Sequence, residues 1–238
     1  YDAAGNRTAS LLASNWIYGT NNQLLAWAAN RLEYDANGDP ISRTSGDQTN
    51  IYIRDEVGRL TEIRDSAGTT RVAYYYDPMG RRLWKDAGGA RTYYSYAGRR
   101  LIGEYDEAGQ QLVRYGYAPG GQAVAPLYMV KDGIYYWLMP DREGRIRKAI
   151  QGSGRVSWSA TYDCFGLATV ETTEVAQIAG LPGMIRDAEA GMYWDWAAAR
   201  YYLPEAGRYL DGAGPDGYAF KDSEPFKLEE HPGSLYEL

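Results

Sequence analysis

Residues 51–87 read IYIRDEVGRLTEIRDSAGTTRVAYYYDPMGRRLWKDA, and the pattern within them decides the fold. Three turn signals of the form Asp-x-x-Gly, at 55–58, 65–68 and 77–80, separate short runs in which apolar and polar residues alternate. Such alternation, rich in Tyr, Val, Ile and Thr, is typical of β-strands. The Asp of each signal accepts hydrogen bonds from backbone amides ahead of it, and the Gly supplies the positive φ that closes the turn. The stretch therefore predicts antiparallel β-hairpins in series.

The same unit recurs along most of the chain. Full copies of Tyr-Asp-x-x-Gly begin at Tyr1, Tyr34, Tyr76, Tyr105 and Tyr162. Copies that lack the Tyr carry their Asp at positions 55, 65, 86 and 141. The residues expected to form the structural turns of the full internal copies are Asp35 and Gly38, Asp77 and Gly80, Asp106 and Gly109, and Asp163 and Gly166. Because one hairpin cannot bury its apolar face alone, we expect the hairpins to join into one sheet.

The composition indicates what kind of sheet this is. The chain has 23 Tyr and 7 Trp but only 3 Phe, and aromatic residues with a polar group suit a face that is partly wet. Strands twist with a fixed hand, so a long ribbon of hairpins coils. No segment between residues 1 and 175 has a convincing helical period. We therefore predict an all-β fold, with serial antiparallel hairpins wound as a spiral sheet.

Charge and reactive residues exclude several classes of function. The formal net charge is −6, and no basic face is available to follow a phosphate backbone, so we expect no nucleic-acid partner. A single cysteine, Cys164, and a single histidine, His231, rule out an internal disulfide and a Cys- or His-based metal site. No apolar run approaches the roughly 20 residues of a membrane-spanning helix. We predict no metal, no cofactor and no membrane span.

The pattern changes at residues 181–210, LPGMIRDAEAGMYWDWAAARYYLPEAGRYL, where Tyr, Trp and Arg are concentrated around two turn signals. After it, residues 218–238 are acidic and lack periodicity. We therefore divide the chain into a hairpin segment at 1–160, a closing module at 161–217 and a tail or linker at 218–238. Because the first residue lies in the middle of a repeat unit, we expect a longer parent polypeptide.

With these residues the chain resembles the Rhs/YD-repeat family, which includes bacterial Rhs toxins, the B/C components of insecticidal toxin complexes and the animal teneurins. The resemblance covers about residues 1–217 and rests on the repeat units and on the closing module. In that module the matching segments are 162–166, 181–183, 187–193 and 200–209. The residues that carry the family's core motif are Arg200, Tyr201, Tyr202, Gly207, Arg208 and Tyr209.

The resemblance implies a specific architecture and role. YD repeats of the family wind into a hollow shell, or β-cocoon, that encloses a C-terminal toxin, and the core module plugs or caps one end. The expected function is a structural shell fragment of a bacterial polymorphic toxin protein, used in interbacterial competition or against a host. The expected partners are the remaining N-terminal part of the shell and a toxin cargo. The expected location is outside the producing cell, by secretion, delivery or display at the cell surface.

Many members of the family also cleave themselves after the core, at paired Asp-Pro-x-Gly motifs. Here the corresponding stretch, residues 211–217, reads DGAGPDG, and Leu203 stands where the family has Asp. The candidates for a cleavage pair are Asp211 and Asp216, and such chemistry needs two close carboxylates of which one is protonated. We expect no enzymatic activity, with a degenerate aspartyl autoprotease as one alternative.

A second alternative is an adhesion module that binds carbohydrate or protein through the Tyr- and Trp-rich surface. Cross-strand packing of aromatic residues explains the same composition, at about 0.2–1 kcal/mol per pair. Turn capping accounts for the repeat Asp residues better than Ca²⁺ binding, which needs several oxygens in one loop. The repeat Arg residues are expected to pair with turn Asp residues or to stack on Tyr.

Overall fold

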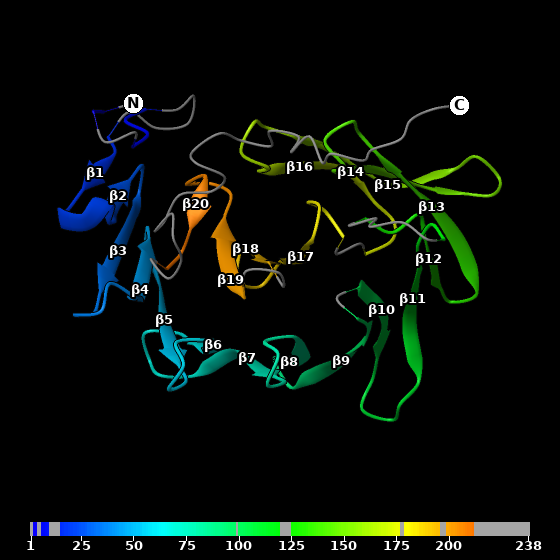
Figure 1. Ribbon diagram of the computed structural model, residues 1–238, viewed down its shortest axis with the longest axis horizontal. Helices are drawn as coiled ribbons and strands as arrows, with labels where there is room; N and C mark the ends of the chain where they lie inside the picture. Colours follow the sequence, from blue (N-terminus) through cyan, green and yellow to red (C-terminus); the bar gives the residue numbers. More distant parts are fainter. Residues whose placement is uncertain are drawn as a thin grey trace.

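The computed structural model of the chain describes residues 2–3, 6–9, 15–98, 100–119, 125–176, 179–195 and 199–211 (Figure 1). These residues form one antiparallel sheet of 16 strands, a second of four strands and a short 3₁₀ helix, η1 (Thr20–Asn22). They contain no α-helix, and so no helix able to cross a membrane. The prediction of an all-β fold made of serial antiparallel hairpins is confirmed.

In the large sheet, each strand pairs with the strand before it and the strand after it in the sequence. Its strands are β1 (Ile17–Tyr18), β2 (Leu24–Trp27), β3 (Asn30–Tyr34), β4 (Pro40–Ser45), β5 (Gln48–Arg54), β6 (Leu60–Arg64), β7 (Thr70–Tyr76), β8 (Arg82–Ala87), β9 (Ala90–Ala97), β10 (Arg100–Tyr105), β11 (Gln111–Gly116), β12 (Tyr128–Lys131), β13 (Ile134–Pro140), β14 (Ile146–Gln151), β15 (Val156–Tyr162) and β16 (Ala168–Thr173). Such a meander needs only local connections, so successive turns lie on opposite rims of the sheet.

The large sheet curves round, and the small sheet lies on its concave side (Figure 1). The strands of the small sheet are β17 (Met184–Asp187), β18 (Met192–Asp195), β19 (Arg200–Leu203) and β20 (Arg208–Tyr209). Alternation along each strand of the large sheet sets which side chains face inward. On β7, for example, Val72, Tyr74 and Tyr76 are buried, whereas Tyr75 is 56% exposed. The main hydrophobic core forms between the inner face of the large sheet and the small sheet.

The Asp-x-x-Gly units form tight turns at the ends of strands. In the turn after β7, Asp77 Oδ1 accepts hydrogen bonds from the amides of Met79 and Arg81, each at 2.9 Å. The amide of Gly80, at φ +80°, donates to the carbonyl of Asp77 at 3.0 Å. The same closing bond, from Gly amide to Asp carbonyl, joins Gly38 to Asp35, Gly109 to Asp106 and Gly166 to Asp163, at 3.1–3.2 Å. Carboxylate and glycine thus satisfy the turn's backbone together.

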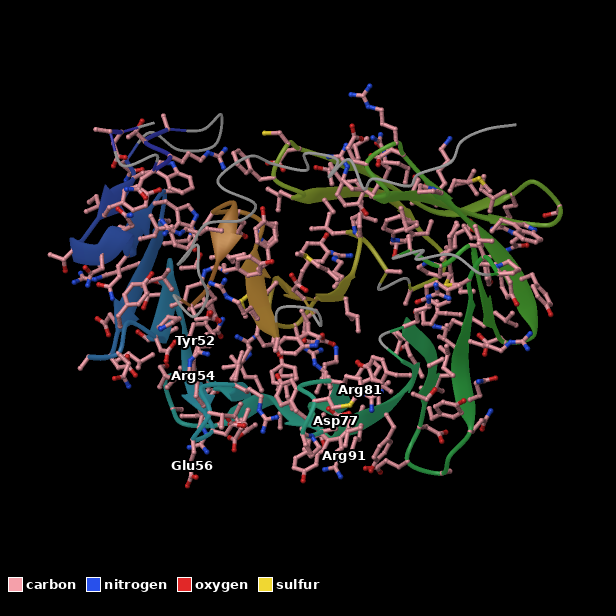
Figure 2. The ribbon with its side chains drawn as sticks, viewed as in Figure 1. Tyr52, Arg54, Glu56, Asp77, Arg81 and Arg91 are labelled. Atoms are coloured by element: carbon pink, nitrogen blue, oxygen red, sulfur yellow. The ribbon has the colours of Figure 1, made fainter. Side chains whose placement is uncertain are left out.

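The Arg that follows the turn glycine connects one turn to another on the same rim. Arg81 Nε lies 2.6 Å from Asp77 Oδ2, and its Nη1 donates to the carbonyl of Gly98, two strands further on, at 3.0 Å. Figure 2 shows Arg81 beside Asp77 at this rim. Arg59 and Arg145 repeat the arrangement, donating to the carbonyls of Asp77 and Asp163 at 3.0 and 3.2 Å. These Arg bonds therefore fix the distance between successive turns on the same rim of the sheet.

The repeat Tyr residues make a second connection across the inner face. The hydroxyls of Tyr76 and Tyr162 each donate, at 2.8 Å, to a backbone carbonyl 16 residues earlier, those of Leu60 and Ile146. The acceptor lies on the preceding strand of the sheet, β6 for Tyr76 and β14 for Tyr162, and neighbouring strands are about 4.8 Å apart. A Leu side chain is too short to span that distance and has no donor. This bond explains why Tyr, and not an aliphatic residue, occupies these repeat positions.

Several connections differ from the repeat pattern. The copy expected at residues 85–89 forms a shorter turn: Asp86 lies within β8 and only Gly88 and Gly89 lie between the strands, although Asp86 Oδ1 still accepts a hydrogen bond from the Gly89 amide at 3.0 Å. Both glycines have positive φ, at 62° and 85°, as the common two-residue hairpin turn requires. Conversely, Gln151 takes the place of Asp in the turn after β14, where Gly154 donates to its carbonyl at 2.9 Å.

We predict that Arg145→Gln lowers the free energy of unfolding by about 1–3 kcal/mol, because the turn loses charge-assisted bonds to a partly buried Asp141. Arg142→Gln is the matched control, since the Arg142 side chain in the same turn is 87% exposed and its change should cost less than about 0.5 kcal/mol. Urea denaturation followed by fluorescence measures both. Equal losses in the two variants would contradict the rim connection.

Candidate functional site

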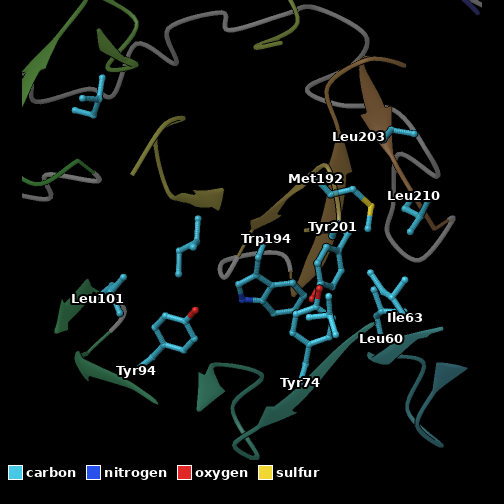
Figure 3. Close-up of a cluster of buried hydrophobic side chains, with 14 of the residues drawn as sticks. Leu60, Ile63, Tyr74, Tyr94, Leu101, Met192, Trp194, Tyr201, Leu203 and Leu210 are labelled. Carbon is cyan, nitrogen blue, oxygen red and sulfur yellow. The ribbon is translucent and has the colours of Figure 1, made fainter. Parts of the chain in front are cut away.

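The small sheet is buried on both faces. All residues of β18 and β19 are buried. Met192, Trp194, Tyr201 and Leu203 pack into the main core (Figure 3), whereas Tyr193, Tyr202 and Tyr209 form a second cluster with Leu181 and Met184. This two-sided burial explains the dense aromatic content of residues 181–210, because both faces of each strand need large side chains.

A buried ion pair joins the two sheets. Arg82, the first residue of β8, and Asp187, the last residue of β17, have side chains that are 1% and 0% exposed. Arg82 Nη1 lies 2.9 Å from Asp187 Oδ2. Lys85 lies three residues further along β8, and its Nζ is 3.8 Å from the other carboxylate oxygen, Asp187 Oδ1, and 2.6 Å from Glu189 Oε2. Neither charge of the central pair reaches water, so each depends on the other.

A directed chain of hydrogen bonds starts from the same arginine. Arg82 Nη2 donates to Tyr201 Oη at 2.6 Å, and Tyr76 Oη donates to the carbonyl of Leu60 at 2.8 Å. The two hydroxyls are 3.0 Å apart. Since Arg only donates and each phenol has one proton, Tyr201 must donate to Tyr76. The chain therefore runs from β8 through β19 and β7 to β6, and crosses between the sheets twice.

Burial keeps the two tyrosine hydroxyls of this hydrogen-bond chain protonated. Removal from water raises the pKa of Tyr76 to about 12 and raises the pKa of Tyr201 well above its usual range, although the Arg82 charge opposes both shifts. The guanidinium also lies over the rings of Tyr74 and Trp194, with 4.5 and 5.5 Å between its central carbon and the ring centroids. Arg82 and the two tyrosines of the hydrogen-bond chain therefore keep the same charges at physiological pH and act as a structural contact between the two sheets.

Further contacts tie the small sheet to other parts of the large one. Arg43 on β4 pairs with Glu205 in the turn after β19. Tyr202 Oη donates to the carbonyl of Phe165 at 2.6 Å, and Arg208 Nη2 donates to the carbonyl of Asn22 at 2.7 Å. The acceptors lie at opposite ends of the large sheet, in η1 and in the turn before β16. The small sheet thus holds the curved sheet from several sides.

The structure brings the core-motif residues together. Arg200 Nε lies 2.7 Å from Asp211 Oδ1, and its guanidinium lies 4.1 Å from the centroid of the Tyr209 ring. Tyr209 Oη donates to Asp195 Oδ2 at 2.5 Å, and burial raises the pKa of Tyr209 far above its usual range. The amide of Gly207 donates to the carbonyl of Leu203 at 2.9 Å and closes the turn before Arg208.

The predicted cleavage pair is placed only in part. Asp211 is buried and paired with Arg200, whereas Asp216 lies outside the described residues, as do Trp196, His231 and the whole tail. A pair formed by Asp211 and Asp216 therefore stays a prediction. Within the described ranges, no group of three or more His, Cys, Asp or Glu side chains is arranged to hold a metal, and Cys164 is exposed in a turn.

Comparison with known proteins assigns the family. The teneurin YD-shell family model matches residues 1–234. The chain belongs to this family. As a YD-shell chain it is 26% identical to double-stranded DNA deaminase toxin A of Burkholderia cenocepacia over 243 residues, which are 89% of this chain and 17% of that protein. It is also 26% identical to toxin protein Tse5 of Pseudomonas aeruginosa over 256 residues, 89% of this chain and 19% of that protein.

Solved structures agree on the fold. A TcdB2-TccC3-TEV crystal structure superposes with a TM-score of 0.67 at 19% identity, over 96% of this chain and 13% of the other. TcdB2-TccC3 without its hypervariable C-terminal region gives a TM-score of 0.53 at 16% identity, over 84% and 13%. The YD-shell chain thus spans less than a fifth of the length of these relatives and structures, and the recognition of the Rhs/YD-repeat family from its motifs is confirmed.

Two features of this YD-shell chain were not predicted from the sequence. Arg82 and Asp187 are 105 residues apart, and only the doubled arginine in GRRLW (residues 80–84) hinted at an extra role. The second is Glu104, which accepts a hydrogen bond from Tyr115 Oη at 2.6 Å on the inner side of β10. Burial raises the pKa of Glu104, and the Tyr115 bond and the charge of Lys131 only partly offset this effect.

We predict that Arg82→Met lowers the free energy of unfolding by about 3–5 kcal/mol, because it leaves the Asp187 carboxylate buried with only the more distant Lys85. Adding Asp187→Asn should recover part of that loss, since the uncompensated charge is then gone. Urea denaturation of the two single variants and the double variant gives the coupling between the sites. Strictly additive losses would show that the two side chains do not act as a pair.

We predict that Glu104→Gln stabilises the protein at neutral pH. With its pKa raised in the folded state, Glu104 binds more protons when folded than when unfolded, so its contribution to stability falls as pH rises above the ordinary carboxyl pKa of about 4.3. The variant removes that fall and still accepts from Tyr115. Unfolding curves from pH 4 to 8 should therefore diverge in favour of the variant as pH rises, in steps of about 1 pH unit.

Glu107→Gln is the control for this series, because the Glu107 side chain is 61% exposed. Its unfolding curves should follow those of the unmodified protein across the range. A Glu104→Gln variant that is less stable at pH 7 would contradict the assignment of Glu104 as a partly buried, destabilising carboxylate.

Proposed function

We propose that this chain is the C-terminal stretch of a protein shell that encloses a toxin and carries it out of a bacterial cell. The single observation that carries the proposal is the small sheet held on the concave side of the large one by the buried pair of Arg82 and Asp187. A curved sheet braced from within by a fixed element would serve as a section of shell wall. In this role the chain contributes structure and no catalysis.

The relatives support a container more than a catalyst. One of them is named for DNA deamination, and zinc-dependent nucleobase deaminases need a set of His and Cys ligands. This chain has one histidine and one cysteine in total, so it lacks such a set. Two toxins share this stretch at the same identity, and each has more than four-fifths of its length elsewhere. A shared stretch without catalytic ligands fits the shell that such toxins have in common.

The parts of the chain take different roles in this proposal. The repeat strands form shell wall, and the wall includes β15 and β16, because both belong to the large sheet. In this proposal the boundary predicted at residue 161 moves to the end of β16. The closing module then comprises residues 174–217, whose small sheet fixes the end of the wall from within, and residues 218–238 are a linker. The partners are further strands of the same shell and an enclosed toxin, and the destination is another bacterium or a host cell.

Imaging and protease protection of the full polypeptide test the proposal. We expect cryo-EM particles to be closed shells with density inside, and an enclosed segment to survive trypsin until the shell is denatured. Arg82→Met should make that segment cleavable at lower denaturant concentrations, whereas Arg71→Met, on the exposed side of β7, should not. Solid particles, or equal cleavage of all segments in the native protein, would overturn the proposal.

A further inference from the structure

The outer face of the large sheet carries an apolar and aromatic patch over strands β11 to β13. Alternation turns Tyr136 and Leu138 inward and leaves Tyr135 and Trp137 on the outer side, 48% and 46% exposed. Other large apolar residues of the same region are also exposed: Leu112, Leu127, Ile134 and Met139. The core does not need these side chains, because the opposite face of each strand already buries its own residues. A contiguous exposed aromatic patch of this kind marks a binding surface.

The three rings of the patch are arranged around Tyr128. Its ring centroid lies 5.7 Å from that of Tyr135 and 5.8 Å from that of Trp137. Across the ladder, Tyr128 faces Gly116, and a Cβ atom on Gly116 would come within 2.1 Å of the Tyr128 ring. The ring therefore lies over the glycine, with the Tyr135 ring tilted by 42° and the Trp137 ring edge-on at 67° to it.

Two exposed cations flank these rings, and one exposed carboxylate, Asp132, lies in the turn between β12 and β13. Arg114 is exposed on β11, and its Nη2 donates to Tyr135 Oη at 3.1 Å. Lys148 is exposed on β14, directly across the ladder from Met139. Within the described part of the chain, neither side chain forms an ion pair with a carboxylate. Two unneutralised cations beside exposed rings stand out in a chain of net charge −6, and they favour an anionic partner.

The geometry also limits the kind of partner. A peptide that binds as an added strand needs a free sheet edge, and both edges of β12 and of β13 are already paired. Nor do the described residues form a groove for a helix here, because the rings lie on the outer side of the curved sheet. Pyranose rings suit such a surface, since their C–H faces pack flat on aromatic rings and their acid groups reach the flanking cations.

We propose that the surface formed by Tyr128, Tyr135, Trp137, Arg114 and Lys148 binds an acidic, uronate-bearing polysaccharide. The rings pack against the sugar faces, and the two cations pair with the carboxylates. This surface lies on the side of the sheet away from the small sheet, so the inference does not rest on the enclosure of a toxin. It would place the outer wall in contact with an acidic glycan layer.

Affinity electrophoresis of the full polypeptide in gels that contain sodium alginate, a polyuronate, tests the inference. We expect alginate to retard the protein and salt to weaken the effect, whereas neutral dextran should retard it at least about tenfold less. Trp137→Ala and the double variant Arg114→Gln with Lys148→Gln should each weaken binding by about tenfold or more. Tyr75→Ala is the matched control, because Tyr75 is also an exposed outer-face aromatic, stacked on Trp84.

Every outcome bears on the inference. Retardation by alginate that Trp137→Ala and the charge variant reduce, and Tyr75→Ala does not, supports it. Absence of retardation, equal retardation by dextran, or binding to poly-glutamate in place of alginate would overturn it. So would self-association of the unmodified protein, measured by light scattering, that Trp137→Ala abolishes, because the patch would then join two copies of the chain. Circular dichroism checks that all variants are folded.

Discussion

The structure depends on one buried ion pair, Arg82 with Asp187, which places one charge on each of the two sheets. Neither side chain could stay ionised in the core without the other, because a lone buried charge costs several kcal/mol. The four-stranded sheet can therefore reach its position only together with the inner face of β7 and β8. The hydrogen-bond chain through Tyr201 and Tyr76 extends this dependence to a second pair of strands. The curved large sheet and the small sheet therefore form one structural unit.

The repeat residues determine the spacing of the turns and strands in the large sheet. Each Asp-x-x-Gly turn is closed locally, but its Arg also bonds to the turn two strands further on, and the repeat Tyr bonds to the preceding strand. Bonds between nearest strands alone would leave the ribbon free to vary in curvature. The Arg bonds, which skip a strand, fix the distance between alternate turns. The same few residue types, repeated, therefore determine both the hairpins and the bend of the sheet.

Local features of this fold could be predicted from the sequence, and non-local ones could not. The Asp77 turn and the alternation on β7 involve interactions within a few residues, so their chemistry is visible in the sequence. The two-residue turn at Gly88 and Gly89 was missed because Asp86 imitates the longer turn. The pairing of Arg82 with Asp187 depends on how 16 strands bend, which no local pattern encodes. Likewise, residues 134–139 (IYYWLM) are apolar throughout, so the sequence does not show that Tyr135 and Trp137 lie on the exposed face.

Native-state hydrogen exchange in increasing denaturant tests most directly whether the two sheets are one cooperative unit. We expect the backbone amides of β18 and β19 to open with the same free energy and denaturant dependence as those of β7 and β8, as residues of one cooperative unit do. Exchange of β17–β20 through a separate opening of clearly lower free energy, with β6–β8 still protected, would contradict it. The small sheet would then be an appended element, and the buried pair would not govern the fold.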